Sequence, residues 1–104
     1  MDANLKKAWV EALRSGEYKQ GNGQLLDRKG RYCCLGVLAK VAGWKISADG
    51  ISVYGEGSHN DGYNAFYRTI GTPHVSTLWW WNDSGTKSFK EIADYIEENI
   101  HADT

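Results

Sequence analysis

The hydrophobic positions of this chain fall into stretches with helical spacing. The first stretch has one apolar face, and Gly16 after it is a residue that commonly ends a helix. Its apolar positions are Leu5, Ala8, Trp9, Ala12 and Leu13. The last stretch opens with a capping box, Ser88 followed by Glu91, and its apolar positions are Phe89, Ile92, Ala93, Ile96 and Ile100. We therefore expect a helix at each of these two places.

Residues 33–42 are apolar on nearly every side, a pattern typical of a helix buried in the middle of a fold. Gly43 follows as a stop, and Gly36 lies inside the run. A glycine within a helix costs about 1 kcal/mol relative to alanine. We therefore expect another backbone or a bulky ring to pass close to Gly36.

Two further stretches are short and rich in aromatic residues. Tyr63, Phe66, Tyr67 and Ile70 have helical spacing and Gly71 follows them, which predicts a short helix. The pair Thr72-Pro73 can open another helix, although a strand through residues 75–81 fits the same positions. The sequence leaves that choice open.

The segments between these stretches favour short hairpins. Residues 24–27 can pair with Arg31 and Tyr32, and residues 44–57 alternate weakly around a turn at 48–50. The expected fold is a single α+β domain over residues 1–104. In it, a buried central helix packs against the first and last helices and short antiparallel hairpins flank it.

Composition narrows the class of protein. A chain of 104 residues with 41% apolar and 24% charged positions fits one domain, and a net charge of −1 argues against coating extended nucleic acid. The charge is uneven, because residues 1–50 sum to +4 and residues 51–104 to −5. With no apolar leader or membrane-length stretch, we expect a cytoplasmic protein without membrane contact. Adjacent Cys33 and Cys34 indicate reduced thiols, and no spacing predicts a metal site or a cofactor.

The five tryptophans are the least ordinary feature, since Trp79, Trp80 and Trp81 are consecutive. Three successive rings cannot all face one core, so at least one is expected to be exposed or to line a cleft. An exposed indole can stack on a nucleobase or anchor a protein interface. Core packing with one partly covered ring is the third alternative.

Residues 18–31 form a basic, glycine-rich segment. Backbone N–H groups around Gly21-Asn22-Gly23 and the side chains of Lys19, Arg28, Lys29 and Arg31 could hold an anion. The segment matches neither a phosphate-binding P-loop nor a dinucleotide fingerprint. A solvated hairpin is the alternative interpretation.

The cysteines allow a catalytic interpretation. A thiol at the start of a helix has a lowered pKa, and Cys33 or Cys34 followed by His74 and Asn82 has the residue order of papain-like hydrolases. The alternative is that both cysteines are simply buried apolar residues.

Three stretches together resemble a family of small proteins found in bacteriophages and prophages. They are residues 9–21 (WVEALRSGEYKQG), residues 32–38 (YCCLGVL) and residues 82–97, with the motifs NDSG and SFKEIADYIE. The resemblance implies an accessory protein that acts inside a bacterial cell. It does not extend to residues 44–81, which contain the three consecutive tryptophans.

Three functional hypotheses fit these features. The first is a counter-defence protein that sequesters a small anionic, nucleotide-derived signal without catalysis, and the residues expected to contact it are Tyr18, Lys19, Gln20, Arg31, Tyr67, Arg68, Trp79, Trp80, Trp81 and Asn82. The second is an inhibitor that docks onto a host enzyme through the tryptophans or the acidic last helix. The third is a cysteine hydrolase. A homodimer that completes a ligand pocket is compatible with the chain length.

Overall fold

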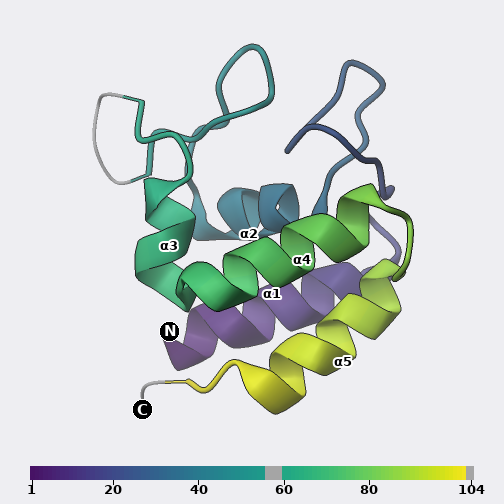
Figure 1. The fold of residues 1–104 in the computed structure, drawn as a ribbon, viewed down its shortest axis with the longest axis vertical. Coiled ribbons are helices and arrows are strands. Elements are labelled where there is room, and N and C mark those ends of the chain that lie inside the picture. Colours follow the sequence, from purple (N-terminus) through teal and green to yellow (C-terminus); the bar gives the residue numbers. More distant parts are fainter. Residues whose placement is uncertain (56–59, 103–104) are drawn as a thin grey trace.

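The structure is a computed structural model that describes residues 1–55 and 60–102. In these residues the chain forms five helices joined by loops (Figure 1). The helices are α1 (Ala3–Ser15), α2 (Cys34–Ala42), α3 (Asn64–Ile70), α4 (Thr72–Asp83) and α5 (Phe89–Asn99). Helix α1 packs against both α5 and α2, and α4 packs against α2 and α3. The loops before and after α2 extend from the same end of the molecule (Figure 1).

Helix α2 is buried, as its apolar run predicts. Every residue from Cys34 to Ala39 is buried. The prediction for Gly36 is also confirmed, because a Cβ atom placed there would lie 1.9 Å from the carbonyl oxygen of Leu25. The indole Nε1–H of Trp9 donates to the carbonyl oxygen of Cys34 at 2.9 Å, which attaches α1 to the start of α2.

The expected helix ends of α1 and α5 are also present. Gly16 follows α1 with a φ of 81°, in the left-handed region that glycine adopts easily. Ser88 and Glu91 form the capping box of α5. The open choice at residues 72–81 is decided as a helix, with Pro73 in the first turn of α4.

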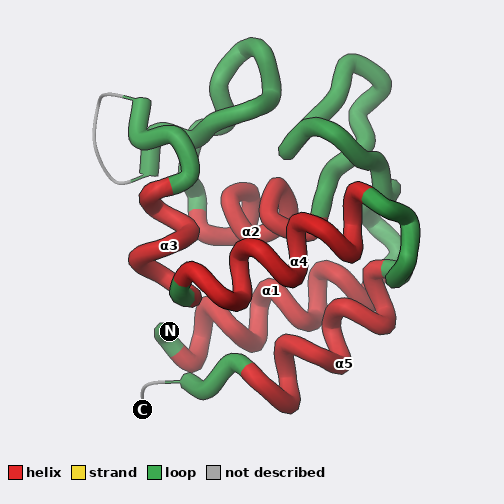
Figure 2. Tube along the Cα trace, viewed as in Figure 1, coloured by secondary structure: helices red, strands yellow, loops and turns green. Residues whose placement is uncertain are grey.

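The α+β fold class is wrong. The described residues contain helices and loops but no strand, and only isolated bridges mark the expected hairpins (Figure 2). In the first hairpin Leu26 bridges Tyr32, and the amide of Asp27 donates to the carbonyl oxygen of Arg31 at 2.9 Å. The pairing stops there because α2 begins directly after Tyr32 and Cys33.

Backbone hydrogen bonds also join the loop before α2 to the loop after it and to the start of α2. The amide of Leu25 donates to the carbonyl oxygen of Gly50 at 2.7 Å, and the carbonyl oxygen of Leu25 accepts from the amide of Cys33 at 3.2 Å. In the second loop, Ile46 bridges Val53 around the expected turn. Part of the predicted second hairpin, residues 56–57, lies outside the described residues. Pairing between loops thus replaces the longer ladders that a sheet requires.

Candidate functional site

The helical register of α4 determines where its three tryptophans lie. Val75, Leu78 and Asn82 are the buried positions of this helix. Because successive residues on a helix are about 100° apart, Trp79 and Trp80 face outward, and they are 46% and 57% exposed. The expectation that the three rings cannot share one core is therefore confirmed.

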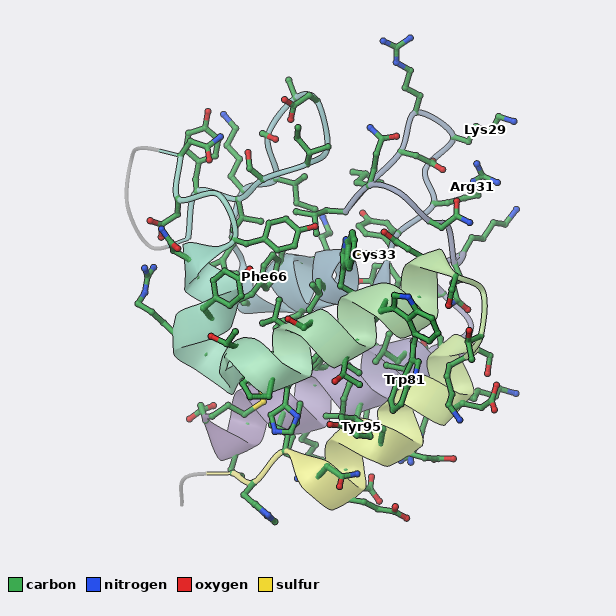
Figure 3. The ribbon with its side chains drawn as sticks, in the orientation of Figure 1. Lys29, Arg31, Cys33, Phe66, Trp81 and Tyr95 are labelled. Carbon is green, nitrogen blue, oxygen red and sulfur yellow. The ribbon has the colours of Figure 1, made fainter. Side chains whose placement is uncertain are left out.

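Trp81 is half-buried and has a structural role. Its ring meets the ring of Tyr95 on α5 edge to face, with centroids 4.8 Å apart (Figure 3). The ammonium nitrogen of Lys87 lies 5.3 Å from the centroid of the Trp81 ring. Trp81 thus covers the contact between α4 and α5 and is separate from the two exposed tryptophans.

The outer surface of α4 is unusual because it carries no charge. The helix has no Lys, Arg, Asp or Glu before Asp83, its last residue. The exposed surfaces of α1 and α5, by contrast, are charged, as expected for helices that face water. In Figure 1 α4 crosses the front of the molecule and no other element covers it.

Tyr67 of α3 adds a third exposed ring beside this surface, and it is 40% exposed. We call Tyr67, Trp79 and Trp80 the aromatic face. Between α3 and α4 the aromatic face contains a groove of about 380 Å³. The groove is lined by Tyr63, Tyr67, Val75, Ser76 and Trp79, and none of these residues is charged.

The basic segment forms a different cleft, of about 450 Å³, which we call the Arg31–Lys87 cleft. Besides these two cations, Gln20, Asn22, Asn82 and Glu91 line it. The Nε of Arg31 is paired with Asp27 at 2.7 Å. Hydrogen bonds from Ser88 lower the pKa of Glu91, so the cleft also holds a carboxylate. Trp79 and Trp80 do not line this cleft, so the structure does not join the exposed tryptophans to the basic segment.

The remaining residues of the expected ligand site line neither the groove nor the Arg31–Lys87 cleft. The ring of Tyr18 packs edge to face on Tyr32, with centroids 5.1 Å apart. Lys19 is exposed, and its carbonyl oxygen accepts from the amide of Tyr32 at 2.8 Å. Arg68, on α3, forms an ion pair with Asp61. Lys29 and Arg31 extend from the first loop (Figure 3).

Gln20 and Asn82 hold together the first loop, α2, α4 and α5, which we call the frame. The side-chain oxygen of buried Asn82 accepts from the amide of Cys34 and from Gln20 Nε2, both at 3.1 Å. Its nitrogen donates to the carbonyl oxygen of Gly21 at 2.7 Å. Gln20 also accepts from the amide of Phe89 at 3.0 Å. The two side chains therefore connect the first loop to α2, α4 and α5.

The cysteines are buried in the core. The Sγ of Cys33 accepts from the amide of Gly36 at 3.4 Å, and the Sγ of Cys34 lies 3.7 Å from the carbonyl oxygen of Leu78. Burial raises the pKa of Cys33 to about 12 and that of Cys34 well above its usual value. His74 contacts Tyr95 at 2.9 Å, and no contact in the described part of the chain joins it to either thiol. Both thiols are therefore protonated at neutral pH.

No group of three or more His, Cys, Asp or Glu side chains in residues 1–55 and 60–102 is arranged to hold a metal ion. Over the same residues, every helix is too short or too polar to cross a bilayer.

Sequence comparison relates the first half of the chain to a known family. A family model described as a domain of unknown function (DUF8296) matches residues 1–50. The match covers α1, the basic loop and α2, and it ends before the aromatic face begins. Neither the curated proteins nor the solved structures give a significant match.

Sequence reasoning missed two features of these sites. It named Gln20 and Asn82 as ligand contacts but did not foresee that they bond to each other, which depends on two segments that are 62 residues apart. It also missed Tyr63 and Ser76 as groove residues. The absence of charge from Thr72 to Asn82 was visible in the sequence and could have indicated the uncharged outer surface of α4.

Proposed function

We propose that this protein acts by binding, without catalysis, and that the aromatic face contacts a partner protein. The observation that carries the proposal is the pair Trp79 and Trp80, exposed on a helix without charge. Buried centres of protein interfaces are enriched in Trp and Tyr and depleted in Lys, Glu and Asp. The aromatic face has this composition.

A broad partner fits the aromatic face better than a small ligand does. A small molecule in the groove would cover Tyr67 and Trp79, which line it. Trp80 does not line the groove, so its ring would remain exposed to solvent. A protein surface covers all three rings at once. The resemblance to small phage proteins supports a bacterial host protein as the partner, whose activity the bound chain would inhibit.

Capture from a bacterial lysate tests the proposal. The bait is the full chain, compared with a Trp79→Ser/Trp80→Ser variant and with Ile51→Ser. Ile51 is a matched control because it is 52% exposed and lies in a loop away from the aromatic face. We expect a stoichiometric partner that the wild type and Ile51→Ser retain and the double variant loses. The purified partner should then bind the wild type in a calorimetric titration.

Three results would contradict the proposal. One is recovery of no stoichiometric partner, and another is equal capture by the double variant. The third is self-association: a dimer in sedimentation analysis that the double variant abolishes would assign the aromatic face to a second copy of the chain.

A second candidate function rests on the Arg31–Lys87 cleft. Two cations from different parts of the sequence line one cleft, as recognition of a small anionic, nucleotide-derived ligand requires. Calorimetry with cyclic and linear nucleotides tests this candidate. Heat that Arg31→Ala and Lys87→Ala abolish and Lys29→Ala retains would support it, since Lys29 is exposed on the same loop but does not line the cleft. Absence of heat from the folded protein would eliminate it.

A further inference from the structure

The groove between α3 and α4 is lined mainly by aromatic residues and contains several hydrogen-bond donors. Its polar atoms are the hydroxyl groups of Tyr63, Tyr67 and Ser76, together with the indole Nε1–H of Trp79. In the described part of the chain, no hydrogen bond occupies any of these four groups, and none of them is buried without a partner. They are therefore available to a bound molecule.

The chemistry of these groups restricts the ligand. An indole N–H can only donate, and burial raises the pKa of Tyr63, so its hydroxyl keeps its proton. Because no lining side chain is charged, the groove offers no counter-charge to a phosphate, a carboxylate or an ammonium group. The indole N–H requires an acceptor, whereas the hydroxyl groups can donate or accept, so the complementary ligand is uncharged and carries hydrogen-bond acceptors.

The volume of the groove, about 380 Å³, also leaves room for a ring. In the described residues, no ring contact joins Tyr67 to Trp79, although both line the groove. The ring of Tyr63 is held from behind by Phe66, with centroids 5.3 Å apart. The groove can therefore receive a small apolar ring, such as that of proline, without displacing Tyr63.

We infer that the groove binds an extended, proline-containing segment of the partner protein. Such a segment forms a polyproline II helix, whose carbonyl oxygens have no internal partners and whose prolines have no N–H. Proline-rich segments dock into grooves lined by aromatic rings. An amphipathic helix fits less well because its own backbone already satisfies its carbonyl oxygens. This inference rests on the proposed function and specifies the part of the partner that the groove receives.

Nuclear magnetic resonance of the full chain tests the inference with a decaproline peptide as the probe. The indole N–H signals report on the tryptophans directly, and Trp79→Phe identifies the signal of Trp79 by its loss. We expect that signal to shift and saturate with decaproline. A ten-residue peptide of alternating glycine and serine, which is also uncharged but has N–H groups and no rings, should leave it unchanged.

Substitutions define where the peptide binds. In calorimetric titrations, Tyr67→Ala and Trp79→Ala should each weaken decaproline binding by about tenfold or more, whereas Ile51→Ala should not change it. Both aromatic residues are exposed, so circular dichroism should show folded variants. No shift of the Trp79 signal, or an equal shift with the glycine-serine peptide, would overturn the inference.

The two proposals fail in different ways. If decaproline has no effect but the Trp79→Ser/Trp80→Ser variant still loses its captured partner, the proline assignment is wrong and the proposed function stands. If decaproline binds the groove but capture does not depend on the aromatic face, the proposed function is wrong.

Discussion

Replacing Asn82 by alanine should destabilise the whole fold. Asn82 is 2% exposed, and its amide joins α4 to the start of α2 and to the first loop. Alanine keeps the helix but removes every one of these hydrogen bonds. We therefore expect a large loss in the free energy of unfolding from a single side chain that touches no proposed ligand in the groove.

The magnitude follows from the three groups that lose a partner. The amide of Cys34 is buried, and a buried N–H without a partner costs about 1–3 kcal/mol. The carbonyl oxygen of Gly21 and the side-chain Nε2 of Gln20 are partly buried, and each lost hydrogen bond costs about 1 kcal/mol. The expected destabilisation is about 4 kcal/mol, a substantial part of the 5–15 kcal/mol typical of a folded domain.

Urea unfolding followed by tryptophan fluorescence measures this loss. With an m value of about 2 kcal/mol per M, the midpoint should fall by about 2 M. Asn4→Ala is the matched control, because Asn4 is exposed on α1 and its side chain makes no hydrogen bond in the described residues. Gln20→Ala keeps the bonds of Asn82 to Cys34 and Gly21, so it stays measurable if Asn82→Ala does not fold. A change under about 1 kcal/mol for Asn82→Ala, equal to the control, would refute the reasoning.

Three other outcomes are expected. Gly36→Ala should lower the free energy of unfolding by about 3 kcal/mol in urea, because its Cβ would meet the carbonyl oxygen of Leu25, whereas Gly16→Ala, in open space at positive φ, should cost about 1 kcal/mol. Iodoacetamide at pH 8.5 should alkylate Cys33 and Cys34 only as fast as the chain unfolds, since burial keeps both thiols protonated; rapid labelling in the folded state, seen by mass spectrometry, would contradict this. Folding raises the pKa values of both thiols, so their contribution to stability is complete below about pH 8.5 and is lost as the pH rises toward 12. The urea midpoint should therefore fall above pH 9, and it should fall less in Cys33→Ala.

Local patterns predicted the helices well because the causes of each helix are local. The capping box at Ser88 and the glycine after α1 act within one turn of the chain. The hairpins could not be predicted in the same way. Residues 24–27 fit the pattern of a strand. The amide of Leu25, however, donates to the carbonyl oxygen of Gly50, which lies in a loop that only the tertiary fold brings near. Pairing between loops then takes the backbone groups that a longer hairpin would use.

The candidate sites likewise have features that follow from local geometry and features that depend on the tertiary fold. That one tryptophan of the run must be exposed follows from helix geometry, and the sequence alone supported it. Whether the exposed rings meet the basic segment depends on how α4 lies across α2. In the structure Arg31 and Lys87 line one cleft, whereas Trp79 and Tyr67 line the groove between α3 and α4. Spacing in the sequence has no information about that separation.

The side chains that hold the frame together come from both halves of the chain. Hydrogen bonds of Gln20, Cys34 and Asn82 connect the first loop to three helices. The aromatic face lies in residues 67–80, outside the family match to residues 1–50. A frame held by buried bonds tolerates changes on an exposed helix surface, because such changes remove none of its contacts. The same frame can therefore present different outer surfaces on α4.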